Sequence, residues 1–384
     1  MKVGWVKKPL GEVCTLQRGF DLPTHQRIAG SFPLISSSGI IDTHTDGPVK
    51  GPGIVTGRSG SVGKVFFIDQ DFWPLNTTLY VRNFHGNDPR FIFYLLILLD
   101  LKSLAGGTGV PTLNRNDVHR KSVHIPLDIQ EQQRIAAILD DAFDGIAKAR
   151  ANTEDSLKNA RELFLSGYAT AFTQSLCDGY KRVTVADMAM PVKGSMRTGP
   201  FGSQLLHSEF VDQGIAVLGI DNAVNNEFRW DKRRYITEEK YRQLSRYQVK
   251  PGDVLITIMG TCGRCAVVPD DIPVAINTKH LCCITLDPEK CSSGFLHGYF
   301  LYHPEAQQFL ASRAQGSIMA GLNMGIISEL PVLLPPLKQQ HSLVSKITTL
   351  RAETQRLESI YQQKLAALDE LKQSLLHQAF SGNL

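Results

Sequence analysis

The 384-residue chain lacks several features that would place it in a class immediately. Its longest apolar run, Phe91–Leu99, is about half of the ~20 residues that a membrane-spanning helix needs. The first residues include the adjacent Lys7 and Lys8 and no apolar signal region. The net charge of +4 excludes a histone-like polycation, although a local basic patch stays compatible with it. We therefore expect a cytoplasmic protein whose seven cysteines are reduced thiols or metal ligands.

Motifs for bond chemistry are also missing. The stretch Gly57–Lys64 resembles a phosphate-binding loop, but Arg58 and Val65 occupy positions where that motif requires Gly and Ser or Thr. In Asn87–Phe91, Arg90 replaces the second proline of the amino-methyltransferase motif, and no HExxH or G-x-S-x-G occurs. Asp270–Asp271 is not followed by the E/D-x-K of a metal nuclease. We expect no catalytic residue in this chain.

The chain contains an internal repeat. Leu10–Gly19 matches Val185–Gly194, Gly60–Lys64 matches Gly260–Arg264, and Asn76–Thr77 matches Asn277–Thr278. Leu113–Asn114 then matches Leu322–Asn323, and Ile125–Gln130 matches Leu334–Gln339. The offset grows from 175 to 209 residues, so the second copy carries insertions, chiefly around residues 195–250.

Each copy begins with a mixed segment of short β-branched runs and Gly-rich turns, and ends with a long segment of helical periodicity. The segments are 1–126, 127–177, 178–336 and 337–384. The two helices show apolar seams that favour pairing with each other, with a phase shift in the first. The expected pairing residues are Ile135, Leu139, Ile146, Leu157, Phe164, Ile347, Leu350, Leu357, Tyr361, Leu368, Leu371 and Leu375. Their opposite net charges, −3 and +2, suit this pairing.

These patterns predict an α+β protein. Two globular α/β-mixed domains are separated by two long antiparallel coiled-coil helices, and the halves are related by a pseudo-two-fold internal repeat. In an alternative arrangement each helix packs separately on its own globular domain, but the matching apolar seams favour pairing of the two helices.

Both copies retain a small-residue turn that ends in a cation, Lys64 or Arg264. Exposed backbone N–H groups, a hydroxyl and a cation suit a DNA phosphate or a guanine edge, although a β-turn with a solvated cation has the same sequence. We selected polar and basic residues near expected turns as candidate DNA contacts. They are Arg18, Arg58, Ser59, Lys64, Asn76, Asn114, Arg115, Lys193, Arg197, Ser203, Arg229, Arg233, Arg234, Thr261, Arg264, Asn277, Lys279, His280 and Asn323.

The cysteines of the second copy permit a zinc site. Cys262 and Cys265 form a CxxC pair, and Cys282, Cys283 and Cys291 follow. However, the CxxC pair aligns with Val62 and Val65 of the first copy. We therefore interpret these cysteines as small apolar strand residues, with no metal bound.

Over essentially its whole length the chain resembles the specificity subunit of type I restriction–modification enzymes. The resemblance rests on Thr198–Leu205, Tyr235–Lys240, Leu244–Leu255, Ile125–Ile135, Leu334–Gln340 and Leu375–Gly382. The first domain departs from the pattern, because it has no counterpart of the T-G-P-F-G-S stretch at Thr198–Ser203.

The resemblance implies two target-recognition domains, each reading one half of an asymmetric double-stranded DNA target, with the helices as a spacer. It implies docking to two modification (methyltransferase) subunits and to restriction/translocase subunits, which would use S-adenosylmethionine, ATP and Mg²⁺. The chain itself would need no cofactor. Two alternatives remain at this point: a zinc-dependent DNA-processing enzyme, and a coiled-coil scaffold without a DNA role.

Overall fold

The computed structural model describes residues 4–106, 111–174, 180–230, 232–313 and 322–384. Contacts divide the chain into two compact units. The first unit comprises Met1–Ser156 and Tyr361–Leu384, and the second comprises Leu157–Ile360. Each unit therefore joins one mixed domain to parts of both long helices, which differs from a division into four separate segments.

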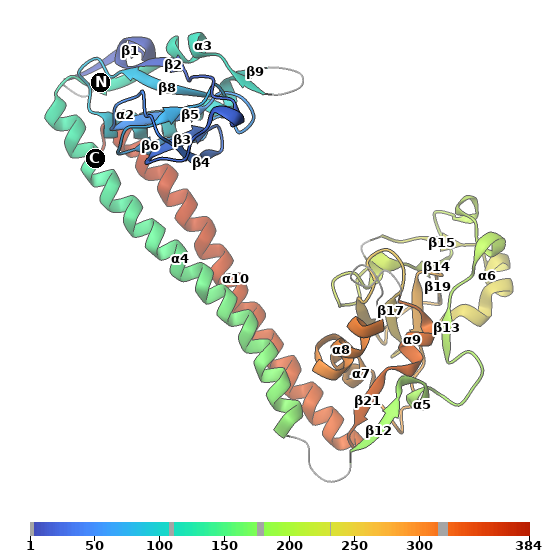
Figure 1. Ribbon diagram of the computed structural model, residues 1–384. Coiled ribbons are helices and arrows are strands. Elements are labelled where there is room, and N and C mark those ends of the chain that lie inside the picture. The colour runs from blue at the N-terminus through green and yellow to red at the C-terminus, as the bar shows by residue number, and fades with distance from the viewer. Residues whose placement is uncertain (1–3, 107–110, 175–179, 231, 314–321) are drawn as a thin grey trace. The chain divides into compact units, whose positions relative to one another are not determined.

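The first unit is built on a four-stranded antiparallel sheet (Figure 1). Its strand order is β2 (Thr15–Arg18), β8 (Thr78–Asn83), β5 (Gly53–Gly57), β6 (Val65–Ile68). A three-stranded sheet contains β4 (Gly39–His44), β3 (Phe32–Ser36) and β7 (Trp73–Pro74), the last two parallel. Two strand pairs join β1 (Trp5–Pro9) to β11 (Ser122–Pro126) and β9 (Ala105–Gly106) to β10 (Thr112–Leu113). The short helices are α1 (Leu10–Val13), α2 (Pro89–Leu98) and α3 (Arg115–His119), with 3₁₀ turns at Thr24–Gln26 and Leu101–Leu104.

The second unit repeats this plan with additions. Its main sheet runs β13 (Met196–Thr198), β20 (Leu281–Ile284), β17 (Val254–Thr257), β18 (Cys265–Val267). Its second sheet runs β15 (Tyr235–Ile236), β14 (Ile215–Leu218), β19 (Ala275–Asn277), β16 (Gln248–Val249), with β14 and β19 parallel. β12 (Lys181–Thr184) pairs with β21 (Pro331–Leu334). The helices are α5 (Val185–Met188), α6 (Glu238–Leu244), α7 (Ser293–Tyr302), α8 (Pro304–Arg313) and α9 (Met324–Glu329), with 3₁₀ turns at Gly202–Gln204, His207–Glu209, Ile220–Asn222 and Ser245–Tyr247. The predicted α+β repeat is confirmed.

The sheet registers correct one end of the sequence alignment. Leu10 and Val185 both open the short helix that follows the first strand, as the offset of 175 predicts. Gly19, however, corresponds to Gly199 rather than to Gly194. Gly19 N donates to Thr78 O (3.1 Å) and Gly199 N donates to Thr278 O (3.2 Å). The Arg18–Phe20 stretch is therefore the first-domain counterpart of Thr198–Pro200.

The two long helices are α4 (Ile129–Gln174) and α10 (Leu337–Ser381). In each, the fourth helical residue is a buried glutamine. Gln132 Nε2 donates to Asn87 Oδ1 (2.8 Å) and Pro126 O (2.9 Å), while its Oε1 accepts from Asp88 N (2.9 Å).

Gln340 makes a similar set of bonds in the second unit, with a backbone carbonyl in place of the Asn87 side chain. Its Nε2 donates to Lys290 O (2.8 Å) and Pro335 O (2.9 Å), and its Oε1 accepts from Ser292 N (2.8 Å). Asp88 and Ser292 are the N-caps of α2 and α7. The repeated glutamine thus ties each domain helix to the start of a long helix.

Within each unit the long helices run antiparallel. In the first unit Arg150 Nη1 lies 2.8 Å from Asp369 Oδ1, and Arg134 Nη2 donates to Leu384 O (2.8 Å). In the second unit Arg161 Nε lies 3.1 Å from Glu358 Oε2. These ion pairs place arginines on α4 and acids on α10, the reverse of what the net charges predict, because each helix carries both signs.

Most of the predicted pairing residues are buried or half-buried. Ile135 and Leu139 join Leu376 and Phe380 in the first-unit core, and Phe164 packs edge-on against Tyr302 with ring centroids 4.9 Å apart. The remaining half-buried members are Ile146, Leu157, Ile347, Leu350, Leu357, Tyr361, Leu368 and Leu375.

Leu371 is the exception and that prediction is wrong, because its side chain is 47% exposed. Leu357, Tyr361 and Leu365 are half-buried, so the seam takes two successive four-residue steps there. It then continues through Leu368 to Lys372, which are also half-buried. The ammonium of Lys372 lies 4.8 Å from the ring centre of Phe143. The shift moves the companion series by one residue, from Leu371 to Lys372, while Leu368 and Leu375 keep their predicted places.

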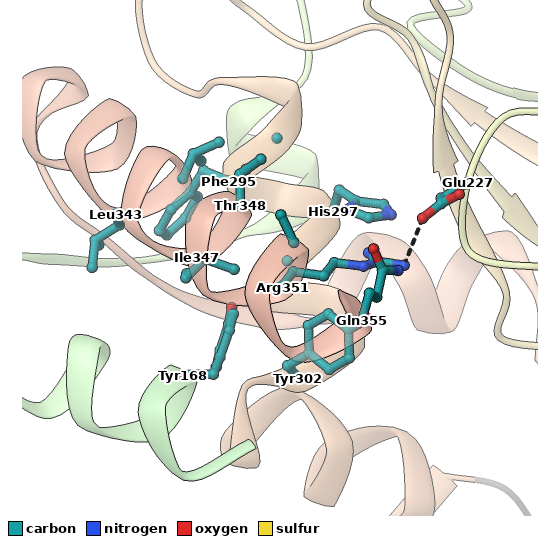
Figure 2. A pocket seen from close by; sticks show the side chains of 14 residues that line it. Tyr168, Glu227, Phe295, His297, Tyr302, Leu343, Ile347, Thr348, Arg351 and Gln355 are labelled. Carbon is teal, nitrogen blue, oxygen red and sulfur yellow. Dashed lines mark hydrogen bonds and ion pairs between the residues drawn. The ribbon is translucent and has the colours of Figure 1, made fainter. Parts of the chain in front are cut away.

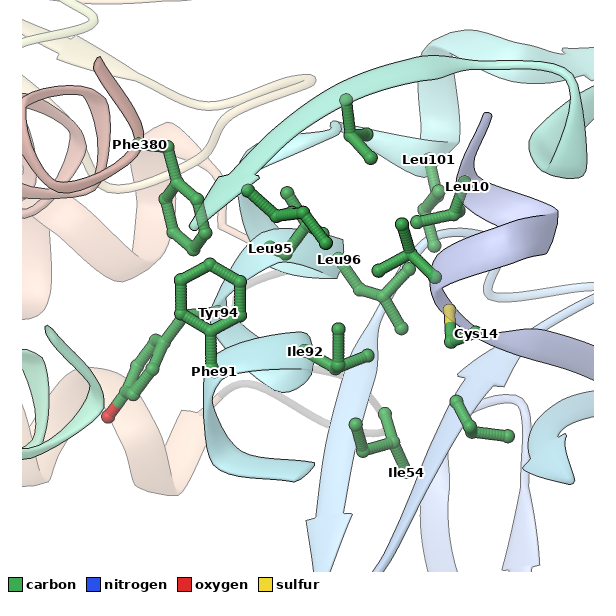
Figure 3. Packing of buried hydrophobic residues seen from close by; sticks show 14 of the residues in the cluster. Leu10, Cys14, Ile54, Phe91, Ile92, Tyr94, Leu95, Leu96, Leu101 and Phe380 are labelled. Atoms are coloured by element: carbon green, nitrogen blue, oxygen red, sulfur yellow. The ribbon is translucent and has the colours of Figure 1, made fainter. Parts of the chain in front are cut away.

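The core of the first unit extends from its sheet onto α10. Phe91 of α2 and Phe380 of α10 have ring centroids 5.0 Å apart, and Leu95, Leu96 and Leu101 lie in the same cluster (Figure 3). At the edge of this cluster Arg90 Nε lies 2.7 Å from Asp140 Oδ1 of α4, and Tyr94 OH donates to the same carboxylate. An arginine of the domain thus pairs with an acid of the long helix.

The corresponding junction in the second unit is a cavity of about 300 Å³ (Figure 2). Counted from the N-caps of α2 and α7, Gly294 and Gly298 stand where the first unit has Arg90 and Tyr94. The ion pair here joins Arg351 Nη2 of α10 to Glu227 Oε1 of the domain (3.0 Å). The polarity of the junction is therefore reversed. None of the described helices is long and apolar enough to cross a membrane.

Candidate nucleic-acid interface

In the first unit the cation-ending turn connects β5 to β6. Gly57 N donates to Lys64 O (3.0 Å) and Gly63 N donates to Gly57 O (3.2 Å), which closes the turn. Gly60 and Gly63 have φ of +86° and +84°, values that glycine adopts without strain. A Cβ on Gly57 would stand 2.0 Å from Ser61 O, so the turn requires glycine there as well.

Neighbouring loops frame this turn. Arg58 N and Ser59 N both donate to Thr77 O (2.9 and 3.1 Å), and Leu113 N donates to Arg58 O (2.8 Å). Asn76 Nδ2 donates to Asp21 Oδ1, and Arg18 Nη2 lies 3.7 Å from the same oxygen. The predicted contacts Arg18, Arg58, Ser59 and Asn76 therefore lie on adjoining loops, and Lys64 is exposed where the turn ends.

The second unit builds the same turn between β17 and β18. Thr257 N donates to Arg264 O (2.8 Å), Gly263 N donates to Thr257 O (2.8 Å), and Arg264 N donates to Thr257 Oγ1 (2.9 Å). Gly260 and Gly263 again have positive φ, +71° and +79°. Thr261 and Arg264 are exposed on this turn, and their contact with DNA stays a prediction.

Three further predicted residues gather beside this turn. Ile258 N donates to His280 O (2.9 Å), which anchors the turn to the Lys279–His280 segment. The pKa of His280 is lowered by its burial and by the neighbouring charges of Lys279 and Arg234. Arg234 is itself held by an ion pair with Asp221. The surface here carries a local excess of positive charge, which favours an anionic partner.

The other second-half candidates are spread over the domain. Lys193 is exposed in the loop after α5, and Ser203 is exposed in the 3₁₀ turn Gly202–Gln204. Arg229 pairs with Glu227 (3.8 Å), and the Arg233 guanidinium lies 5.6 Å from the ring centre of Trp230. Their role in an interface stays a prediction.

Two predicted contacts are wrong because their side chains lie in the interior. Asn277 is fully buried on β19, where its Nδ2 donates to Leu281 O (3.2 Å). Arg197 is 10% exposed, and its Nη2 lies 2.6 Å from the buried Asp253 Oδ2. Arg197 also donates to Gln248 O (2.6 Å) and Thr285 Oγ1 (2.9 Å), so it stabilises the domain interior.

The matched Leu-Asn pairs have a structural explanation. Asn114 Oδ1 accepts from Asn116 N (3.0 Å) and caps α3, while Asn323 Oδ1 accepts from Ile326 N (3.0 Å) and caps α9. Asparagine is among the preferred N-cap residues. Both side chains are exposed, as is that of the neighbouring Arg115.

The second-unit cysteines lie mainly in the main sheet. Cys265, Cys282 and Cys283 are fully buried strand residues, and burial raises the pKa of the Cys282 thiol to about 12. Cys262 differs from the strand prediction, because it lies half-buried in the turn. Among the described residues, no group of three His, Cys, Asp or Glu side chains is gathered for a metal ion. Cys177 lies outside the described residues.

Sequence reasoning missed Asp21, Phe201 and Met259. The first holds Arg18 and Asn76 in place, and the other two are exposed apolar residues beside the second turn. Asp21 and Phe201 follow Gly19 and Gly199 by two positions. The close backbone approach of these glycines is visible only in the fold, where a Cβ would stand 2.3 Å from Leu75 O in one and 2.2 Å from Asn277 O in the other.

A family model for the type I restriction modification DNA specificity domain matches residues 2–158 and 211–366. The chain belongs to this specificity family. Each matched range contains one of the two cation-ending turns and part of a long helix, so the family model covers the repeat seen in the fold.

Curated members of the specificity family are distant relatives. The chain is 29% identical over 174 residues to the type I restriction enzyme EcoBI specificity subunit of Escherichia coli, an alignment that covers 45% of this chain and 36% of that subunit. It is 20% identical over 310 residues to the MjaVIII specificity subunit of Methanocaldococcus jannaschii, covering 77% and 70% respectively. The chain thus spans about a third of one relative's length and about two thirds of the other's.

Two solved structures share the fold of this chain. A chain from a study of complex assembly and conformational transition of the type I R-M system aligns with a TM-score of 0.78 at 17% identity, covering 100% of this chain and 99% of that one. The HsdS subunit from Thermoanaerobacter tengcongensis aligns with a TM-score of 0.58 at 16% identity, covering 100% and 98%.

Proposed function

We propose that this chain is the DNA-reading subunit of a type I restriction–modification enzyme and that each unit reads one half of a bipartite, asymmetric target. The observation that carries this proposal is the cation-ending turn, which occurs once in each unit and carries different side chains in the two units. The first turn presents Arg58, Ser59 and Lys64, whereas the second presents Met259, Thr261 and Arg264. Because direct readout depends on the side chains that reach base edges, the two half-sites should differ in sequence.

The long helices would dock two modification subunits, and restriction/translocase subunits would complete the enzyme. Leu163 and Leu165 on α4 and Ile360 on α10 support this role, since these large apolar side chains are exposed within the second unit. Exposed apolar side chains of this size commonly mark protein interfaces. The chain would contribute no catalytic residue, and its partners would bind S-adenosylmethionine, ATP and Mg²⁺.

The decisive experiment is methylome sequencing of cells that express this chain with its cognate modification subunit. We expect one bipartite adenine-methylated motif. Replacing residues 1–126 with another domain of the family should change one half-site and leave the other unaltered. A change in both half-sites, or methylation without any motif, would contradict the proposed division of labour.

Docking is tested separately by copurification. A Leu163→Glu/Leu165→Glu double variant should lose the modification subunit, because it places charges on two sides of α4 and any contact there would have to desolvate them. Val192→Glu is the matched control, since Val192 is equally exposed but lies in the domain rather than on a helix. Equal retention of the partner by both variants would show that the exposed leucines of α4 do not contact the modification subunit.

A further inference from the structure

Two loops of the second unit present large apolar side chains beside the cationic turn. Phe201 is 50% exposed and Met259 is 39% exposed. Both loops are anchored to the same short segment: Gly199 N donates to Thr278 O (3.2 Å) and Ile258 N donates to His280 O (2.9 Å). Phe201 lies two residues after the anchor at Gly199, and Met259 lies one residue after the anchor at Ile258. The two anchors bond to Thr278 and His280, which flank Lys279.

The backbone that carries these side chains is well fixed. Ile258, directly before Met259, is buried, and the hydrogen bonds of Thr257 close the turn behind it. On the other loop, Gln204 N donates to Phe201 O (3.2 Å), and Gln204 Oε1 accepts from Tyr247 OH (3.0 Å). The exposed side chains are thus carried by hydrogen-bonded backbone, and each loop is anchored next to the Lys279–His280 segment.

The corresponding positions of the first unit are polar. Strand register places Asp21 at the position of Phe201 and Ser59 at that of Met259. Asp21 accepts from Asn76 and pairs with Arg18. The same loop framework therefore forms with a carboxylate and a hydroxyl, so folding does not require the apolar pair.

We propose that Phe201 and Met259 form an apolar wedge that enters the base stack of the DNA half-site read by the second unit. This inference rests on the proposed function. Apolar side chains of this kind can separate adjacent base pairs and kink the duplex, while nearby cations hold the phosphates. The wedge would favour a flexible pyrimidine–purine step, because such steps unstack at the lowest cost. The second half-site would then be selected partly by deformability, and the first mainly by hydrogen bonding.

The test uses the full chain assembled with its modification subunits and target duplexes that carry 2-aminopurine, an adenine analogue whose fluorescence rises on unstacking. Methyltransferases extrude the base that they modify, so the analogue is placed at positions other than the methylated adenines. We expect a several-fold rise at one such position in the second half-site and at no such position in the first. Phe201→Ala and Met259→Ala should each reduce that rise and weaken target binding by about 10-fold.

Matched controls separate the wedge from general surface effects. Met324 is 37% exposed on α9, and Leu206 is 49% exposed in the loop after Phe201. Met324→Ala and Leu206→Ala should leave fluorescence and affinity unchanged. If the assembled enzyme binds and methylates its target with no unstacking, or if the wedge variants unstack the base as the native chain does, the wedge is refuted while the proposed function stands. If it binds no target sequence specifically, the proposed function fails first.

Discussion

The two units have the same main-sheet topology, but equivalent interior positions of the two sheets are filled by different side chains. In the second unit the main sheet encloses the buried pair Arg197–Asp253. In the first unit Gln17 and Gly53 occupy those register positions, and the ring of Phe72 lies 2.3 Å from where a Cβ on Gly53 would stand. One sheet is thus completed by an ion pair and the other by an aromatic ring. The frame is defined by backbone pairing and glycine turns, and its interior tolerates either chemistry.

The largest expected effect comes from removing one partner of the buried ion pair. Arg197→Ala should destabilise the second unit by about 3–5 kcal/mol, because the buried Asp253 carboxylate loses its cationic partner. Gln17→Ala should cost the first unit less than about 1.5 kcal/mol, since it removes one hydrogen bond from Arg82 (3.0 Å). Urea unfolding checks both: Trp230 reports the second unit, and Trp5 and Trp73 report the first. A stable Arg197→Ala protein with altered DNA sequence preference would instead restore Arg197 as a base-reading residue.

A smaller and more symmetrical effect is expected at the repeated glutamine. Gln132→Ala and Gln340→Ala should each destabilise their own unit by about 2–3 kcal/mol, because a buried N–H and a buried carbonyl lose their partner. Exposed Gln133 provides the control, and its replacement by Ala should have little effect. Unequal losses at the two sites, measured by unfolding with the same tryptophan reporters, would show that the two junctions differ in strength despite equal geometry.

Each arginine of the two cation-ending turns should contribute to binding of one half-site only. Arg58→Ala and Arg264→Ala in the assembled complex should weaken target binding by about 10- to 100-fold, the value of one good base or phosphate contact. Competition with targets mutated in one half-site tells which half-site each arginine serves. Arg356→Ala on α10 is the control, since Arg356 is exposed and lies outside both domains. If neither turn variant changed binding, a scaffold without a DNA role would regain support.

Acidification should produce the mildest effect and should affect the second unit more. Burial lowers the pKa of His119 in the first unit, whose Nε2 accepts from Leu16 N (2.8 Å). In the second unit burial lowers the pKa of His280, of His297 and, to about 4, of His303. A lowered pKa in the folded state means that the unfolded chain binds more protons, so stability is present above pH ~6.5 and is lost as the pH falls.

The loss is at most about 1.4 kcal/mol per pH unit for each histidine. Urea unfolding at pH 7.5, 6.0 and 5.0, followed through Trp230 and through the first-unit tryptophans, should show the steeper decline for the second unit. His303→Gln should flatten that decline. Equal slopes for both units would contradict the assignment of the three second-unit histidines.

The general plan was accessible from the sequence because the signals for it are periodic or repeated. Helical periodicity predicted α4 and α10, and the paired glycines of the two turns predicted their shared geometry. The details failed where a pattern was extrapolated. Leu371 was predicted from a heptad repeat, but the buried seam departs from that repeat near Leu365. Asn277 was aligned with Asn76, although two more residues separate Asn277 from the strand that follows it. Gly194 was matched in place of Gly199, because strand register is invisible without the fold.

The reversed polarity of the two domain–helix junctions bears on whether a domain could be moved from one long helix to the other. A first domain transplanted onto α10 would bring Arg90 towards Arg351, with Thr348 at the place of Asp140. Like charges in a partly desolvated junction repel, so this hybrid would assemble poorly. A domain can therefore be replaced at its own end of the molecule far more readily than it can change ends, and the order of the two half-sites would be inherited with the helix rather than with the domain.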